Sequence, residues 1–210
     1  DIFWSNVGHR IDRHIKSPLY SSEFWWFVGL FLGDGWVDSK RNKITISCNI
    51  KEEEITNRLY KLINQLFNRS ASKRVRNNCV EISFSCKQLS YFLNNHFKKY
   101  ALGKSIPDWA KKIDIDSKQQ LIQGYLDSDG CITYDKKRDL YGLDFVSINL
   151  ALLEDIQDVL FSLGHVSGIN ILRKESVHDI SGKISKTKET YQLRVGHHHT
   201  ISFLKETAPI

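Results

Sequence analysis

The 210-residue sequence contains no methionine, only three prolines and no low-complexity tract. With 41% hydrophobic and 26% charged residues, it has the composition of a folded protein and not of a disordered one. The apolar run at residues 24–32 is far shorter than the roughly 20 residues that cross a bilayer, and no signal segment opens the chain. We therefore expect a soluble, intracellular protein without a membrane partner. Because position 1 is Asp and not Met, we also expect a chain processed or excised from a longer precursor.

The sequence also lacks the paired cysteine spacings of zinc modules. Its four cysteines, at positions 48, 79, 86 and 131, are scattered, and we interpret them as free thiols in a reducing compartment. Positive charge, in contrast, is in excess. The formal net charge of +6 favours an acidic partner, with nucleic acid first and an anionic membrane surface second.

Two segments of the chain repeat one another. FWWFVGLFLGDGWV at residues 24–37 is an apolar helix pattern that ends on Asp34, and LIQGYLDSDGCITY at residues 121–134 has the same pattern and ends on Asp129. The C-terminal end of a helix carries partial negative charge, so a carboxylate there is disfavoured. Its presence in both copies indicates that another interaction favours it.

The segments after each apolar helix repeat as well. After the apolar helix of each copy, hydrophobic periodicity predicts two strands, a helix, two strands and a final helix, so that each unit has the order α-β-β-α-β-β-α. We expect an α+β fold of tandem, pseudo-twofold repeats with these segments: a lead-in at 1–21, a first repeat at 22–103, a linker at 104–116 and a second repeat at 117–210. The extra length of the second copy, residues 173–190, is expected to form a long polar hairpin loop.

Small residues recur at helical spacing in the two apolar helices: Gly29, Gly33, Gly124 and Ser128. If these helices pack side by side on the pseudo-twofold axis, their backbones approach closely and the two terminal carboxylates emerge together. Paired carboxylates repel one another unless a cation lies between them, and an all-oxygen site suits Mg²⁺. Such a site beside a basic surface fits phosphodiester hydrolysis.

The segments FVGLFLGDG (27–35) and IQGYLDSDG (122–130) resemble the two dodecapeptide motifs of single-chain LAGLIDADG homing endonucleases. The resemblance extends through the doubled element order and is closest to endonuclease domains found inside inteins. It implies two antiparallel four-stranded sheets that form a DNA-binding saddle, and a monomer with Mg²⁺, or Mn²⁺ as a substitute. It further implies double-strand cleavage with 3′ overhangs at a long, weakly palindromic or asymmetric site, an origin in an intein or larger precursor, and a place with cytoplasmic, nucleoid or organelle DNA.

The same resemblance assigns roles to individual residues. Asp34 and Asp129 are the catalytic metal ligands, Gly33 and Ser128 join the metal site, and Lys104, in GKSIPDW, is the catalytic lysine. From the residues alone, a lone lysine in a linker indicates a surface charge. The first motif has Leu32 where the second has Asp127, but only the later acid is the family's metal ligand. A second lysine is expected from the other repeat, either in a chain that extends beyond residue 210 or at Lys205 or another lysine, and none is selected.

Cationic residues in the strands and turns are the expected DNA contacts, with arginines able to read guanine and lysines holding phosphates. They are Lys40, Arg41, Lys43, Lys73, Arg74, Arg76, Lys136, Lys137, Arg138, Arg173, Lys174 and Arg194. Taken singly, each is also explained as a solvated charge. An alternative function is a catalytically inactive nucleic-acid binder on the same scaffold, such as an intron RNA maturase or a transcription regulator; the two intact acids favour the enzyme.

Some conspicuous residues have structural interpretations. Trp25, Trp26 and Trp36 are expected to fill the core or the seam between the repeats. Asn49 and Asn149 fall at the same strand-to-helix junction of the two copies, where both are expected to be helix N-caps.

Overall fold

The computed structural model describes residues 17–180 and 183–207, with side chains described outside 178–185. Of the expected lead-in, residues 1–16 lie outside the described residues, and the rest contains a single 3-10 turn, η1 (Pro18–Tyr20). Within the described ranges, no helix is both long enough and apolar enough to cross a membrane. The four cysteines are free thiols, as interpreted from the sequence.

The first repeat has the predicted element order. Its elements are α1 (Ser22–Asp34), β1 (Gly35–Asp38), β2 (Lys43–Asn49), α2 (Glu53–Phe67), β3 (Ser72–Arg76), β4 (Cys79–Ser85) and α3 (Lys87–His96). The four strands form one antiparallel sheet in the order β1-β2-β4-β3. Apolar residues alternate along β2 and β4, so one face of this sheet is covered by the helices and the other is left for polar side chains.

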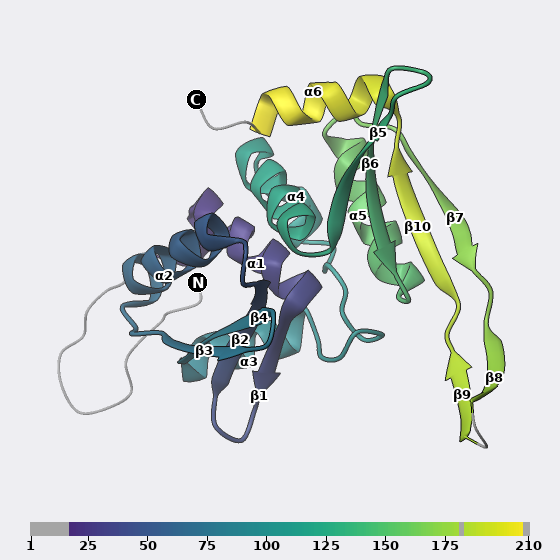
Figure 1. Cartoon of the computed structure of the whole chain (residues 1–210). Helices are drawn as coiled ribbons and strands as arrows, with labels where there is room; N and C mark the ends of the chain where they lie inside the picture. The colour runs from purple at the N-terminus through teal and green to yellow at the C-terminus, as the bar shows by residue number, and fades with distance from the viewer. Residues whose placement is uncertain (1–16, 181–182, 208–210) are drawn as a thin grey trace, which may run out of the picture.

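The second repeat has the same order with one addition. Its elements are α4 (Ile115–Asp129), β5 (Gly130–Asp135), β6 (Leu140–Ser147), α5 (Leu150–Ser162), β7 (Ser167–Arg173), β8 (Ser176–Ile180), β9 (Lys183–Thr187), β10 (Thr190–Val195) and α6 (His197–Thr207). Strands β5-β6-β10-β7 form the second antiparallel sheet. The predicted α+β fold of two four-stranded sheets is confirmed, and Figure 1 shows the sheets on either side of α1 and α4.

The extra residues of the second repeat form a two-stranded ribbon. Strands β8 and β9 pair only with each other, and Figure 1 shows them extending beyond the ends of β7 and β10. The expected hairpin is therefore present, with regular strands in place of most of the expected loop. The matching connection of the first repeat is a tight turn at Asn77, which has a positive φ of 51°.

Helix α1 is buried along most of its length, from Phe24 to Leu32. Trp25 and Trp26 are fully buried, as predicted. The prediction for Trp36 is wrong, because this side chain is 47% exposed. Alternation along β1 directs Val37 toward the helices and core, whereas Trp36 pairs with Thr45 on the opposite face of the sheet.

Helices α1 and α4 pack with their backbones in contact, as the small residues predicted. A Cβ atom added to Gly29 would lie 2.6 Å from the backbone nitrogen of Tyr125, and one added to Gly124 would lie 2.9 Å from the carbonyl carbon of Trp26. Neither distance is compatible with van der Waals packing. At Gly29 and Gly124 the glycines thus allow the backbones of the two helices to meet directly.

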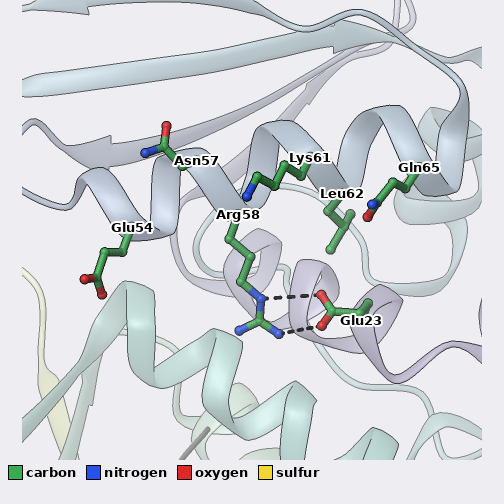
Figure 2. Close-up of a pocket in the computed structure, with 7 residues that line it drawn as sticks. All are labelled: Glu23, Glu54, Asn57, Arg58, Lys61, Leu62 and Gln65. Carbon is green, nitrogen blue, oxygen red and sulfur yellow. Dashed lines mark hydrogen bonds and ion pairs between the residues drawn. The ribbon is translucent and has the colours of Figure 1, made fainter.

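A polar network ties this seam together. The Trp26 indole N–H donates to Asp127 Oδ2 at 2.7 Å, and the Arg58 guanidinium lies 4.0 Å above the centroid of the Trp26 ring. Figure 2 shows Arg58 reaching from α2 to Glu23, and the same guanidinium donates to Gln120 of α4 at 2.8 Å. Asp127, the earlier acid of the second motif, therefore links the second repeat to Trp26 of the first.

Candidate active site

The two terminal carboxylates of the motifs lie where a helix passes directly into a strand. Gly35 and Gly130 both have extended backbone and not the left-handed conformation. A Cβ on Gly35 would meet the Cα of Phe31, and one on Gly130 would lie 2.7 Å from the Cα of Leu126. Glycine is required because the chain turns back against the last helical turn, and this turn presents the preceding carboxylate at the start of each sheet.

The pseudo-twofold seam brings Asp34 and Asp129 together. A Cβ added to Gly33 would lie 3.3 Å from Cγ of Asp129, so the second carboxylate sits beside the last turn of α1. Loss of hydration and then the charge of Asp129 raise the pKa of Asp34 from 3.8 to about 6. Loss of hydration also raises the pKa of Asp129. The fold therefore holds two acids together against their repulsion.

Lys104 completes this group from the linker. Its Nζ donates to the carbonyl oxygen of Gly33 at 2.8 Å, and the residue is only 6% exposed. Burial lowers the pKa of Lys104 from 10.5 to about 8, although both carboxylates act to raise it. The surface position that residue type alone indicated is wrong. The side chain is buried because the linker folds back over the carboxyl-terminal end of α1.

A cavity of about 330 Å³ opens beside Asp34 and Lys104. Lys98 and Lys99, in the turn after α3, also line it. Sequence reasoning missed both residues, although the run HFKKYALGK places them a few positions ahead of Lys104. Lys99 donates to the hydroxyl of Ser39, and Lys98 has a positive φ of 63°. This side of the site is therefore more cationic than the sequence indicated.

The donor set fits a hard divalent cation. The ligands expected from the resemblance are the carboxylates of Asp34 and Asp129 with the carbonyls of Gly33 and Ser128, and the Gly33 carbonyl already accepts from Lys104 Nζ at 2.8 Å. The Ser128 hydroxyl donates to the carbonyl oxygens of Gly124 and Tyr125 within α4. In the described part of the chain, no group of three or more His, Cys, Asp or Glu side chains gathers to hold a metal by itself. Two carboxylates suit an ion that keeps waters and accepts phosphate oxygens, as Mg²⁺ does.

The proposed second lysine stays a prediction. Lys205 is exposed near the end of α6. Among the described residues, Lys104 is the cation whose charge acts on the pKa of both Asp34 and Asp129.

The expected DNA contacts lie on strands and at hairpin turns of both sheets. Lys40, Arg41 and Lys43 lie at the β1–β2 turn, Lys73, Arg74 and Arg76 on β3, Lys136, Lys137 and Arg138 at the β5–β6 turn, and Arg173 and Lys174 at the end of β7. Register places Arg74 opposite Glu81 on the polar face, whereas Lys73 lies opposite buried Ile82.

Arg194 differs from the other cations. It lies on β10, and its guanidinium is held by Asp144 through two hydrogen bonds of 2.7 Å. Asp144 is 3% exposed, so this arginine balances a buried charge within the second sheet. A DNA contact from Arg194 would be made by a side chain that is already fixed in place.

Comparison with known proteins agrees with this geometry. Residues 116–207 match the model of the LAGLIDADG-like domain. A structure of I-DmoI in complex with its nicked target DNA and manganese is similar at a TM-score of 0.61, with 18% identity over 90% of this chain and 96% of that one. The chain has the LAGLIDADG fold. The resemblance drawn from the two motifs is thereby confirmed for the fold and for the second repeat.

Other relatives share the fold or part of the sequence. The LAGLIDADG domain of DUF199/WhiA is similar at a TM-score of 0.57, with 15% identity over 93% of this chain and 86% of that one. The ribonucleoside-diphosphate reductase NrdEB subunit alpha of Bacillus subtilis is 22% identical over 84% of this chain, and the DNA polymerase of Thermococcus litoralis is 22% identical over 73%. The chain spans only 18% and 9% of those two relatives.

Proposed function

We propose that this LAGLIDADG protein is a site-specific endonuclease that uses a divalent metal, preferably Mg²⁺, to cut both strands of duplex DNA and leave 3′ overhangs. The observation that carries the proposal is the convergence of Asp34, Asp129 and a buried Lys104 from two helices and the linker. Two ionised acids whose pKa values are raised by folding destabilise the metal-free folded chain, and a bound cation would offset this cost.

The residues of the site have separable roles in this reaction. Asp34, Asp129 and the carbonyls of Gly33 and Ser128 would hold metal, which when bound activates water and stabilises the departing oxygen. The water oxygen bonds to phosphorus, the P–O3′ bond breaks, and the 3′ oxygen receives a proton. The ammonium of Lys104 lies beside the carboxylates, where it would stabilise charge on the phosphate or orient the attacking water.

Duplex DNA is the proposed partner of the two sheets. The similar I-DmoI structure holds its target DNA, and the cations of this chain lie along strands and turns of both sheets. A monomer with two related but non-identical sheets would read two different half-sites, which gives a long, asymmetric or weakly palindromic target.

An origin within a larger precursor is supported by the two partial relatives. A ribonucleotide reductase and a DNA polymerase perform unrelated chemistry, yet a similar segment makes up less than a fifth of each. A segment shared in this way is better explained as an inserted module than as part of either catalytic apparatus. We therefore propose an intein or another host protein as its source.

The alternative is a nucleic-acid binder on the same scaffold that does not cut. It is supported by the likeness to the N-terminal LAGLIDADG domain of DUF199/WhiA, which shows that this fold also occurs in a protein other than I-DmoI. The buried lysine at the two carboxylates favours the enzyme, because neither its burial nor the paired acids would serve a surface that only binds DNA.

Cleavage of a randomised duplex library, with Mg²⁺ and with EDTA, tests the proposal. Discrete Mg²⁺-dependent double-strand breaks with a fixed stagger are expected when the ends are sequenced. Asp34→Asn and Asp129→Asn should each abolish cutting and leave DNA binding largely intact. If both variants still cut, the assignment of the site is wrong. Enrichment of bound sequences without any cutting would support the alternative.

A further inference from the structure

The side chain of Asn149 is bonded in three directions. Its Oδ1 accepts from the backbone N–H of Leu152 at 3.2 Å, which is the N-cap of α5 that the sequence predicted. Its Nδ2 donates to two carbonyl oxygens outside the helix, those of Ala101 at 2.9 Å and Lys104 at 2.8 Å. The residue is 4% exposed, so the bonds are shielded from water. The cap explains only the first of the three.

Helix α5 holds the linker at a second point. Asp155, further along this helix, accepts from the backbone N–H of Ile106 at 2.7 Å. The same carboxylate pairs with Lys111 at 2.6 Å. Thus α5 of the second repeat holds the backbone at and just after Lys104, while the side chain of Lys104 reaches the Gly33 carbonyl of the first repeat.

The equivalent residue of the first repeat does nothing comparable. Asn49 is exposed, its Oδ1 accepts from the N–H of Lys51 at 3.0 Å, and Glu52 is the N-cap residue of α2. The predicted N-cap role of Asn49 is therefore wrong. Since the fold forms without a buried amide at this junction of the first repeat, the amide donor bonds of Asn149 are not a requirement of the repeat.

We infer that Asn149 is a positioning residue for Lys104, and that its amide fixes the linker backbone so that Nζ is held against the Gly33 carbonyl beside Asp34 and Asp129. The inference rests on the proposed endonuclease function. Lys104 has several rotatable bonds, and its reach is set by where its backbone is anchored. A displacement on the order of 1 Å at a catalytic group lowers rates by about 100-fold.

A double-mutant cycle tests this role. Asn149→Asp keeps the acceptor for the Leu152 N–H but has no donor, and Asn149→Ser keeps an acceptor but has a shorter side chain with one hydroxyl donor in place of two amide N–H groups. Either should slow single-turnover DNA cleavage about 10- to 100-fold at saturating enzyme, with the DNA Kd unchanged. In a Lys104→Ala background neither should slow it further. Fully additive losses, or an effect equal to that of the matched control Asn49→Ser, would overturn the inference.

Lysine labelling separates this inference from the proposed function. With the metal-free chain and an acetylating reagent, Lys104 should react about 10-fold faster in the Asn149 variants than in the unsubstituted chain, while exposed Lys205 reacts equally in all. If the unsubstituted chain never cuts but Lys104 is unmasked in this way, the proposed function fails and the positioning contact stands. If Lys104 stays protected in both folded variants, the contact does not position it and the inference fails.

Discussion

At the scale of single residues, the carboxylates of Asp34 and Asp129 make the metal-free site electrostatically unfavourable. The pKa of Asp34 is 3.8 when unperturbed and about 6 in the folded chain. As pH rises above about 4, the unfolded chain releases this proton first, so stability falls up to about pH 6 and is not regained at higher pH. Lys104 offsets part of this penalty, because its charge lowers the pKa of both acids.

Removing one of the acids should therefore stabilise the metal-free chain. We expect Asp34→Asn to raise the Tm at pH 7.5 in EDTA by a few degrees, equivalent to about 1 kcal/mol after allowance for solvent screening. The gain should shrink to a small fraction near pH 4, where the carboxyl is protonated in the folded chain and about half protonated in the unfolded one. Thermal unfolding between pH 4 and 8 measures it, and a lower Tm for the variant at pH 7.5 contradicts the prediction.

Divalent metal should stabilise the chain that carries both acids and not a variant that lacks them. We expect millimolar Mg²⁺ to raise the Tm of the unsubstituted chain at pH 7.5, since an ion that binds only the folded state stabilises it. The rise should be smaller at pH 5, where Asp34 is largely protonated, and absent in the Asp34→Asn, Asp129→Asn double variant. An equal rise in the double variant would place the metal elsewhere.

The sequence predicted the carboxylates of the site better than its lysines. Asp34 and Asp129 were found because internal repetition places them at matching helix ends. Lys104 was assigned only by resemblance, because its burial depends on contacts with Gly33 and α5 that are distant in sequence. Lys98 and Lys99 were missed for the same reason, since only the folded turn brings them to the cavity.

At the scale of elements, the seam between α1 and α4 determines the geometry of the site. Gly124→Ala would place a Cβ against the backbone of Trp26, which cannot move without displacing α1. Overpacking of this kind costs about 1–3 kcal/mol, and we expect a clear loss of Tm and of cleavage. Gly168→Ala on β7 is the matched control, because its Cβ meets no atom within 4 Å. Similar Tm losses in the two variants would contradict the close packing.

The bond between Trp26 and Asp127 gives a second test of the seam. The first motif has Leu32 at the position of Asp127, so Asp127→Leu makes the two motifs alike at this position. It should cost about 1–3 kcal/mol, because the buried indole N–H of Trp26 loses its acceptor. Denaturant unfolding measures this cost. In a Trp26→Phe background, which has no indole N–H, the further cost of Asp127→Leu should be smaller, and an equal cost in both backgrounds would exclude the bond as its cause.

Element order was predictable because hydrophobic periodicity is local. The structure differs from the prediction where a segment's conformation depends on contacts with residues distant in sequence. Asn49 and Asn149 have the same sequence setting, yet only Asn149 meets a linker backbone that it can hold. Residues 173–190 are polar in sequence, and only cross-strand pairing makes them a ribbon.

At the scale of the whole molecule, the second repeat projects further than the first. The β8–β9 ribbon continues beyond the ends of β7 and β10, and exposed Arg173, Lys174 and Lys186 lie on or next to it. Replacing residues 176–187 by an Asn-Gly turn should leave the Tm unchanged, since this ribbon pairs only with itself. We expect the DNA footprint to shorten at one end only, and the dependence of log Kd on log salt to become shallower. Footprints and salt titrations of both proteins test this; an unchanged footprint would exclude the ribbon as a DNA contact.

Lys104 is bonded to the first repeat through its side chain and to the second through its backbone, and this limits how related proteins can recombine their repeats. A recombinant joined between α3 and Lys104 keeps this lysine with its own Asn149 but presents it to a foreign Gly33 carbonyl. A recombinant joined just before α4 keeps Lys104 with Gly33 and separates it from Asn149. In either chimera Lys104 must form one of its two hydrogen-bonded contacts, through Nζ or through its carbonyl oxygen, with a foreign repeat. The small residues of α1 and α4 must also pack against a foreign helix. New pairings of half-site specificity are therefore expected to arise more readily through substitutions on the sheets than through exchange of whole repeats.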